Sequence, residues 1–254
     1  MTAIARAVAR PELTLAELGG VQYAPWASAG PWLADRWHQG EHVTLIGPTG
    51  VGKTTLAERL LPIRDYVLIL ASKPRDTSLR RYARHGGYRI VQRWQDVRPP
   101  IVRGGQVRGD SRVILWPPFR GPGDRGRQRA EFEQALESVW AAGGWTVYAD
   151  ELYYLTDLGL RDWLDTLWTQ GRSLGLTVVG GVQRPRNVSL NSLSQASWLY
   201  LWRSADAYDL RRVAELDTAS TDTIATVVAH LPPHEVLVVQ TRTGDMIRTR
   251  APRP

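Results

Sequence analysis

The chain has 254 residues, no cysteine and a formal net charge of +7. This length suits one large α/β domain with a sizeable core and is short for two independent domains. The lack of cysteine excludes disulfide bonds and thiolate metal sites, and because no stretch reaches the roughly 18 apolar residues of a membrane span we expect a cytoplasmic protein without membrane insertion.

The first 25 residues show no sustained periodicity and contain Pro11 and Gly19-Gly20, so we expect an N-terminal arm followed by one domain over residues 26–254. Apolar runs and helical patterns then alternate along the chain. Strands are expected at residues 43–46, 66–71, 88–91, 112–116, 145–149, 177–182 and 198–202. Helices are expected at residues 53–61, 79–84, 127–142, 160–174 and 205–216. A terminal β-hairpin is expected from strands at residues 235–240 and 246–250. This alternation predicts an α/β fold with a mostly parallel sheet flanked by helices.

A glycine-rich loop, GPTGVGKTT, lies between the first predicted strand and the first predicted helix. It fits the Walker A pattern G-x-x-x-x-G-K-[ST], in which backbone N–H groups and the start of the helix surround phosphate groups. Lys53 would place its charge between the β- and γ-phosphates, and Thr54 would supply a hydroxyl group to Mg²⁺. The predicted nucleotide-binding residues are Gly47, Pro48, Thr49, Gly50, Val51, Gly52, Lys53, Thr54 and Thr55.

The strand at residues 145–149 ends in two acids, Asp150 and Glu151. In a parallel sheet this end reaches the edge where the Walker A loop also lies. We therefore predict that Asp150 holds Mg²⁺ through its water shell and that Glu151 polarises the water that attacks the γ-phosphate. Together with Lys53 these residues predict an ATPase whose cofactors are ATP and Mg²⁺.

The order of the motifs argues against a GTPase. The segment from Ser72 to Asp76, SKPRD, only partly matches the [NT]KxD guanine-binding pattern, and it precedes Asp150 instead of following it. Adenine is therefore the expected base. Transfer of phosphate to a small acceptor stays open, although the acid pair favours water as the acceptor.

Gln183 follows the strand at residues 177–182. We expect it beside Asp150, where its amide can hydrogen-bond the γ-phosphate and the attacking water. A single glutamine at a strand end is more often an ordinary polar residue where the chain leaves the sheet, so this assignment depends on the neighbouring motifs.

Three segments together resemble the FtsK/HerA superfamily of DNA-pumping ATPases: the Walker A loop, Ala149-Asp150-Glu151, and GRSLGLTVVGGVQRP from Gly171. The resemblance extends from about Gly40 to Leu210 and implies a RecA-like core that acts as a ring, with ATP at subunit interfaces. By this resemblance Gln183 matches a polar sensor. Arg172 matches an arginine offered in trans to the neighbour's γ-phosphate, with Arg184 and Arg186 as competing candidates and a solvated helix-end residue as the alternative.

The compact length looks like the viral genome-packaging branch of this superfamily. That branch implies a homo-oligomeric ring, a pentamer or hexamer, which drives double-stranded DNA through a portal vertex of the capsid. Such a protein would work in the host cytoplasm, transiently at a procapsid, and its DNA affinity would fall steeply with salt. Candidate DNA contacts lie in two arginine-rich loops, at residues 103–112 and 120–129, for which a solvated basic loop is the alternative. They are Arg103, Arg108, Arg120, Arg125 and Arg127.

A P-loop ATPase that acts on protein is the rival interpretation. Assembly and secretion factors of filamentous phages or conjugation systems are examples. Because such factors typically carry a membrane anchor, the sequence favours DNA as the substrate.

Overall fold

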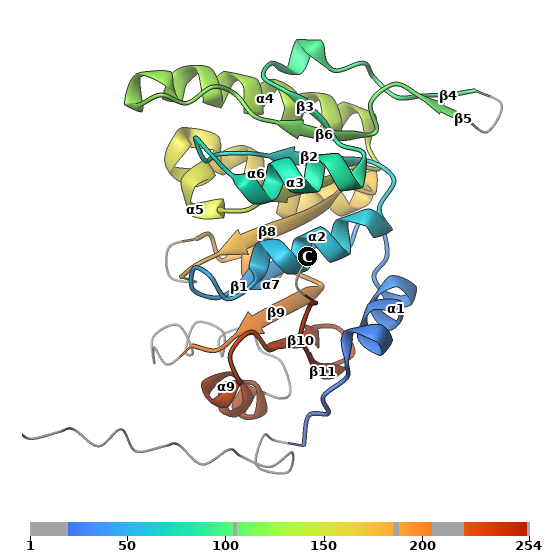
Figure 1. The fold of residues 1–254 in the computed structure, drawn as a ribbon, viewed down its shortest axis with the longest axis vertical. Coiled ribbons are helices and arrows are strands. Elements are labelled where there is room, and N and C mark those ends of the chain that lie inside the picture. Colours follow the sequence, from blue (N-terminus) through green and yellow to red (C-terminus); the bar gives the residue numbers. More distant parts are fainter. Residues whose placement is uncertain (1–19, 104–105, 185–187, 205–220, 253–254) are drawn as a thin grey trace, which may run out of the picture.

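The computed structural model describes residues 20–103, 106–184, 188–204 and 221–252 (Figure 1). Nine of its strands form the main sheet. They are β1 (Val43–Ile46), β2 (Val67–Leu70), β3 (Arg89–Val91), β6 (Arg112–Leu115), β7 (Thr146–Ala149), β8 (Thr177–Val182), β9 (Trp198–Trp202), β10 (Val236–Gln240) and β11 (Met246–Thr249). Their order is β11-β10-β9-β1-β8-β7-β2-β6-β3. The strands from β9 to β3 in this order pair in parallel, and β10 pairs antiparallel with β9 and β11, which confirms the mostly parallel sheet and the C-terminal hairpin.

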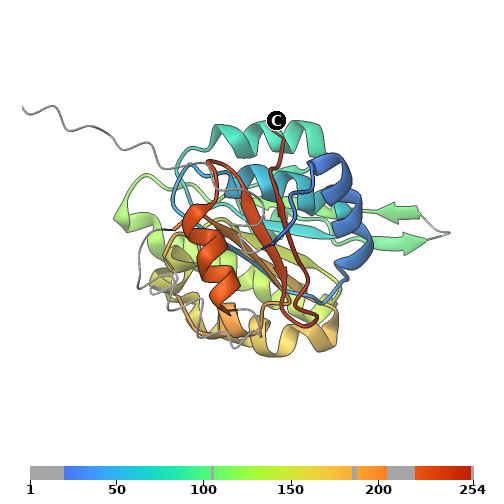
Figure 2. The same ribbon diagram turned by 90° about the horizontal axis from the view of Figure 1, so that it is seen from below.

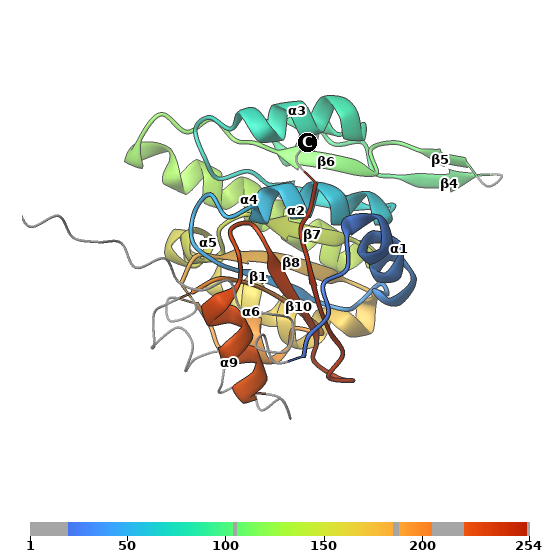
Figure 3. The ribbon, with the colours of Figure 1, turned by 60° about the horizontal axis from the view of Figure 1, so that its bottom comes forward.

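Helices cover both faces of the sheet (Figure 2, Figure 3). The helices are α1 (Trp26–Arg36), α2 (Lys53–Leu60), α3 (Thr77–Gly86), α4 (Arg125–Ala142), α5 (Leu152–Leu155), α6 (Arg161–Gln170), α7 (Asn191–Ser194) and α9 (Thr221–His230). One face packs on α1, α2 and α3, and the other packs on α4, α6 and α9. Successive residues of β2 point to opposite faces: Leu68 lies in the second of these cores and Ile69 in the first. A parallel sheet buried on both faces explains why its strands read as continuous apolar runs.

The parallel strands give the sheet two chemically different edges. The Walker A loop after β1, the acids after β7 and Gln183 after β8 all lie at the carboxyl edge, because each follows the end of a parallel strand. The segments that precede the strands lie at the amino edge. They include the turn η5 (Gly171–Leu174) and a separate hairpin of β4 (Ile101–Arg103) and β5 (Gln106–Arg108).

From its glycines we expected the arginine-rich segment at residues 103–112 to be a loop. The structure instead forms a hairpin there. Strands β4 and β5 pair antiparallel from Ile101↔Arg108 to Arg103↔Gln106, and Arg112 already begins β6. The hairpin extends away from the body of the molecule (Figure 1, Figure 3). In the sequence IVRGGQVR, β-branched residues flank Gly-Gly on both sides, a hairpin signal that outweighs the loop-forming tendency of glycine.

The predicted helix at residues 205–216 and residues 1–19 of the N-terminal arm lie outside the described residues. The rest of the arm is packed: Val21 is buried, and Tyr23 forms a β-bridge with Arg248. Helix α9 and most of α1 were not predicted from the sequence. Among the described residues, no helix combines the length and the apolar character needed to cross a membrane.

Candidate nucleotide-binding site

The Walker A loop has a backbone that requires glycine at two positions. Gly50 has φ 83° and Gly52 has φ 115°, both in the left-handed region that side chains rarely adopt. Gly47 needs to be glycine for a different reason, since a Cβ there would lie 2.8 Å from Cβ of Trp202 on the neighbouring strand β9. The loop therefore lies against a tryptophan side chain and leads directly into α2, whose first residue is Lys53.

The ammonium group of Lys53 is held inside this loop. Its Nζ donates to the carbonyl oxygens of Gly47 at 2.5 Å and Pro48 at 2.9 Å, and the residue is buried. Burial lowers the pKa of Lys53, and the nearby carboxylates of Asp150 and Glu151 act in the opposite direction. Two carbonyl oxygens of the Walker A loop thus fix the cation at the place where the phosphates are expected to bind.

Asp150 accepts hydrogen bonds on both carboxylate oxygens. Thr54 Oγ1 and Tyr148 Oη donate to Oδ1 at 2.9 and 2.8 Å, and Lys73 Nζ forms a close ion pair with Oδ2. Burial acts to raise the pKa of Asp150, but the bonds from Lys73, Tyr148 and Thr54 outweigh it and the pKa is lowered. The carboxylate is therefore ionised at neutral pH.

Glu151 and Gln183 meet directly at the carboxyl edge. Strand β8 lies between β1 and β7, with Val182 opposite Ile46 and Gly180 opposite Ala149, so the end of β8 reaches both Walker motifs. Gln183 Nε2 donates a hydrogen bond to Oε2 of Glu151. Burial raises the pKa of Glu151, while this bond and the charge of Lys53 act to lower it. A carboxylate with a raised pKa suits a general base.

Two glycines of β8 bring this strand close to the second Walker motif. A Cβ on Gly180 would lie 2.5 Å from Leu152 Cδ1, and a Cβ on Gly181 would lie 2.1 Å from the carbonyl oxygen of Asp150. No side chain fits at either position without moving its neighbours. The Gly-Gly pair before Val182 is therefore what lets Asp150 and Glu151 approach Gln183.

The donor set fits Mg²⁺ bound together with a nucleotide. Thr54 and Asp150 place oxygen atoms 2.9 Å apart at the carboxyl edge, and oxygen ligands are those Mg²⁺ prefers. Among the described residues, no cluster of three or more His, Cys, Asp or Glu side chains could hold a metal by itself. Mg²⁺ commonly uses one or two protein ligands together with substrate phosphates, which this arrangement allows.

No protein-family model and no curated protein matches the chain. Solved structures of low sequence identity do share its architecture. The genome-packaging NTPase B204 of Sulfolobus turreted icosahedral virus 2, in complex with sulfate, aligns with a TM-score of 0.61 and 14% identity over 85% of this chain and 98% of that chain. VirB4 of Thermoanaerobacter pseudethanolicus aligns with a TM-score of 0.59 and 11% identity over 84% and 89% of the two chains. The pCW3 conjugation coupling protein TcpA aligns with a TM-score of 0.52 and 16% identity over 86% and 61%.

The chain shares the α/β fold of these solved structures over 82% to 86% of its length. This fold is consistent with the resemblance seen in the three sequence segments. The same B204 has been solved with AMP, AMPPCP and ATP-γS, so nucleotide binding is established for that protein.

Within this P-loop fold Arg172 lies far from the Walker motifs of its own chain. It is exposed in η5, at the amino edge, and its carbonyl oxygen accepts from Gly175 N. Strand β8 spans about 20 Å between this turn and the carboxyl edge. Arg172 therefore cannot reach the γ-phosphate site of its own chain. Arg184 is exposed at the carboxyl edge, and Arg186 lies outside the described residues.

The five candidate DNA contacts lie at opposite edges of the sheet. Arg103 and Arg108 belong to the β4–β5 hairpin at the amino edge. Arg120 follows β6 at the carboxyl edge, where Arg125 and Arg127 lie in the first turn of α4 and not in the expected loop. The side chain of Arg103 lies outside the description, while Arg108 and Arg127 are exposed.

Two of these arginines already pair with acids. Arg120 pairs with Asp124 at 3.3 Å, and Arg125 pairs with Asp157 at 2.7 Å. Their charges are partly neutralised within the chain.

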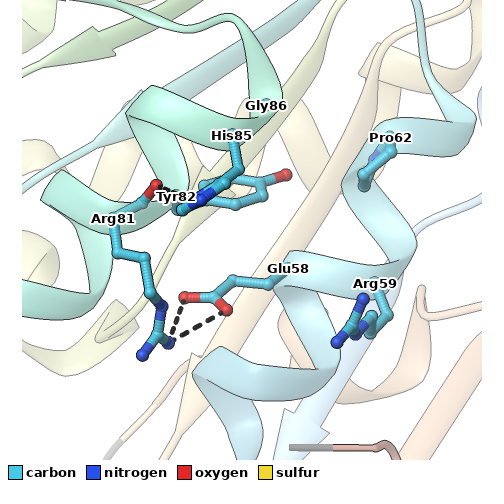
Figure 4. Close-up of a pocket in the computed structure, with 7 residues that line it drawn as sticks. All are labelled: Glu58, Arg59, Pro62, Arg81, Tyr82, His85 and Gly86. Carbon is cyan, nitrogen blue, oxygen red and sulfur yellow. Dashed lines mark hydrogen bonds and ion pairs between the residues drawn. The ribbon is translucent and has the colours of Figure 1, made fainter. Parts of the chain in front are cut away.

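A separate cavity of 380 Å³ opens between α2 and α3 (Figure 4). Arg81 points toward Glu58 and pairs with it at 3.4 Å, so the two charges neutralise each other. Tyr82 and His85 complete one wall. The side chains that line this cavity include none of the predicted site residues, and the cavity lies apart from the Walker motifs.

Sequence reasoning missed Lys73 and Tyr148 as parts of the site. Tyr148 appeared only as an apolar strand residue, and Lys73 appeared only in the imperfect guanine-binding pattern. One signal was available: Lys53 and Lys73 are the only lysines among 32 basic residues, and both lie at the carboxyl edge. In a chain that otherwise uses arginine, each lysine was a candidate site residue.

Proposed function

We propose that the chain is an Mg²⁺-dependent ATPase that translocates double-stranded DNA, with residues 26–254 as its ATPase domain. One observation carries the ATPase assignment: Lys53 and the adjacent acids Asp150 and Glu151 come from two separate segments and meet at the carboxyl edge of one sheet. The low-identity likeness to packaging and conjugation ATPases supports the assignment through the fold.

The chain's own groups have separate roles in this reaction. The backbone N–H groups of the Walker A loop after Pro48 and the start of α2 bind the phosphates, and Lys53 neutralises the charge that develops on them. Thr54 and Asp150 hold the metal ion, which supplies charge neutralisation at the phosphates. These groups position the nucleotide and lower the energy of the charged transition state.

Glu151 orients and polarises the attacking water. Its carboxylate is half-buried and bonded to Gln183, so its orientation depends on the glutamine. Gln183 follows β8, the strand between the two Walker motifs. Its amide can move its hydrogen bond from Glu151 to an oxygen of the γ-phosphate. This exchange would make Gln183 a sensor of the nucleotide state.

The proposed substrate is double-stranded DNA, and the proposed setting is a viral genome-packaging motor. The alignment with this chain covers 98% of the packaging NTPase B204. In this proposal the subunits form a pentameric or hexameric ring at a portal vertex, in the host cytoplasm, and Arg172 acts on the neighbour's nucleotide. Its place at the edge opposite the chain's own ATP site supports a role across an interface. The exposed Arg108 and Arg127 are the foremost candidate DNA contacts.

A protein-directed or conjugative ATPase is the second candidate. VirB4 and the conjugation coupling protein TcpA share the fold at identities similar to that of B204. The fold alone therefore gives no preference between these functions, and the response to DNA distinguishes them.

The deciding measurement is the steady-state ATPase rate with and without duplex DNA, at low and at moderate salt. A DNA motor should be stimulated by duplex, and the stimulation should fade with salt because phosphate contacts release counterions. Lys53→Ala serves as the control for contaminating ATPases, and single-stranded DNA of equal length tests strand preference. A rate that ignores duplex at both salt concentrations would contradict translocation and favour the second candidate. A rate no higher than that of Lys53→Ala would contradict the ATPase itself.

A further inference from the structure

Asp150 is the proposed metal-binding carboxylate, yet three protein groups already donate to it. Thr54 and Tyr148 bond Oδ1, and the ammonium group of Lys73 contacts Oδ2. A metal ion and its water shell need access to the same oxygens. Oδ2 keeps one acceptor position beside Lys73, but an ammonium ion and a divalent cation on the same carboxylate repel each other, so we expect a donor to move when the metal binds.

The structure distinguishes the three donors by their freedom to move. Tyr148 is 1% exposed within β7, so its hydroxyl group is fixed by the sheet. Thr54 is itself the expected metal ligand in the first turn of α2 and stays in place. The side chain of Lys73 is 50% exposed and is a flexible chain of four methylene groups, so it can leave Asp150 more readily than the other two donors.

A second acid is ready to receive the ammonium group. Asp76 Oδ2 lies 3.9 Å from Lys73 Nζ, at the start of α3. The side chain of Asp76 is only 11% exposed and caps the helix by accepting from Leu79 N at 3.0 Å. Its position is thus fixed whether or not Lys73 pairs with it.

The backbone at Lys73 is also fixed, which confines the movement to the side chain. The carbonyl oxygen of Lys73 accepts a hydrogen bond of 2.7 Å from Trp116 Nε1, at the end of β6. The preceding carbonyl, that of Ser72, accepts from the buried amide of Gln128 at 3.4 Å. The ammonium group can swing between two fixed acids without moving the loop.

We propose that Lys73 and Mg²⁺ exchange on the carboxylate of Asp150, with Asp76 holding the ammonium group when the metal is bound. Lys73 then sets the metal affinity of the site by competition, and Asp76 favours the metal by offering the lysine another partner. This inference rests on the proposed metal role of Asp150. Lysine suits this exchange because its ammonium is a compact charge on a flexible stem, whereas arginine would bind the carboxylate in a two-bond fork.

The test is the affinity of the full chain for Mn²⁺ in the presence of ADP, measured by electron paramagnetic resonance of free Mn²⁺. Lys73→Met should lower the Mn²⁺ dissociation constant about fivefold, because the competing ion pair is lost. Asp76→Asn should raise it about threefold, since asparagine preserves the helix cap but no longer attracts the ammonium. In the double variant, Asp76→Asn should no longer change the Mn²⁺ dissociation constant, because there is no lysine for Asp76 to bind.

Arg75→Met is the matched control. It removes a positive charge from an exposed residue two positions along the same loop, so it tests whether any lost charge tightens the metal. It should change the dissociation constant less than twofold, because screening weakens exposed charges. Should Lys73→Met fail to fold, Lys73→Gln replaces it with the same expectation.

The outcomes separate this inference from the proposed function. Parental Mn²⁺ affinity in both Lys73 variants would overturn the exchange while leaving the ATPase intact. An equal tightening by Arg75→Met would also overturn it, since the effect would then be general charge. If the parent chain binds no Mn²⁺ with ADP, the metal role of Asp150 and this inference both fail.

Discussion

The two edges of the sheet use charge in different ways. At the amino edge the buried Asp110 is gripped by two arginines: Arg89 contacts Oδ2, and Arg98 donates its backbone N–H to Oδ2 at 2.8 Å and a guanidinium N–H to Oδ1 at 3.2 Å. Burial acts to raise the pKa of Asp110, but these bonds outweigh it and the pKa is lowered. The contacts of Asp110 with Arg89 and Arg98 anchor the base of the β4–β5 hairpin in a single geometry.

At the nucleotide site on the carboxyl edge, Asp150 and Glu151 instead meet a lysine, a tyrosine and an amide. Lys73 has two acids within reach, and Gln183 bonds Glu151 at an exposed position. Three hydrogen bonds from two arginines hold Asp110 in one geometry, while single-point lysine and amide contacts allow partners to be exchanged. Total basic charge therefore says little about the site, because the groups that contact each acid decide whether it anchors the chain or exchanges partners.

The largest expected effect tests whether the amino edge also serves catalysis in a neighbouring subunit. Arg172→Ala should lower the ATPase rate by a factor on the order of 10³ to 10⁵, the range for an arginine that stabilises phosphoryl transfer in trans. Mixing Arg172→Ala with Lys53→Ala subunits should restore part of the activity, because some interfaces would pair an intact arginine with an intact Walker A loop. A mixture no more active than its components would argue against action across an interface.

The next effect isolates the carboxyl edge. Glu151→Gln should lower turnover by a factor on the order of 10² to 10⁴, the usual contribution of a general base, while nucleotide binding stays at the parental level. Rate and binding are measured separately, by phosphate release and by fluorescent-nucleotide titration. An unchanged rate would contradict the role of Glu151.

The parent enzyme offers a second test of the same carboxylate. Because burial raises the pKa of Glu151, its active ionised form is lost as the pH falls through a value above the ordinary glutamate range. The acid limb of the rate profile should therefore lie above that range. A limb within the ordinary range would mean that another group limits the rate.

These two edges were predictable from the sequence to different degrees. The strands after which the site residues lie were predicted closely: β1 and β8 match their predicted bounds, β7 differs by one residue, and the P-loop followed from its spacing. Long apolar runs and fixed motif spacings are local signals. They place Lys53, Asp150 and Gln183 at one edge without knowledge of side-chain contacts.

The contacts that distinguish exchange from anchoring were not local. Lys73 and Asp150 are 77 residues apart in sequence, and no spacing encodes their meeting. The β4–β5 hairpin was missed because its glycines were interpreted as a loop, although β-branched residues flank Gly-Gly on both sides. Helix α9, TDTIATVVAH, has few turns, and its apolar residues gave no long period.

The third prediction concerns the pH dependence of stability at the amino edge, which depends on His42. His42 is 2% exposed, and its Nδ1 accepts a hydrogen bond from Val178 N at 3.0 Å, which requires the neutral ring. Burial, with a smaller contribution from Arg172, lowers the pKa of His42 to about 4 from the ordinary 6.5. Below pH 6.5 the unfolded chain takes up a proton that the folded chain refuses. The free energy of unfolding should therefore fall by about 3 kcal/mol as the pH falls from 6.5 to 4.

Urea unfolding at a series of pH values measures this dependence. His42→Asn keeps a hydrogen-bond acceptor near Val178 N and does not titrate, so its unfolding free energy should fall less steeply over the same range. Other groups contribute equally to both curves. Parallel curves for the two proteins would show that His42 is not the source.

The smallest effect tests the close approach that builds the carboxyl edge. Gly181→Ala should lower the free energy of unfolding by about 2 kcal/mol, because its Cβ would lie 2.1 Å from the carbonyl oxygen of Asp150 and that strand end must shift. The same shift should weaken Mn²⁺ binding with ADP, since Asp150 moves with its backbone. Gly123→Ala is the control: a Cβ there meets no atom within 4 Å, so it should change stability by less than about 0.5 kcal/mol. Equal stability of both variants would mean that β8 accommodates a side chain and that the Gly-Gly pair does not position the acids.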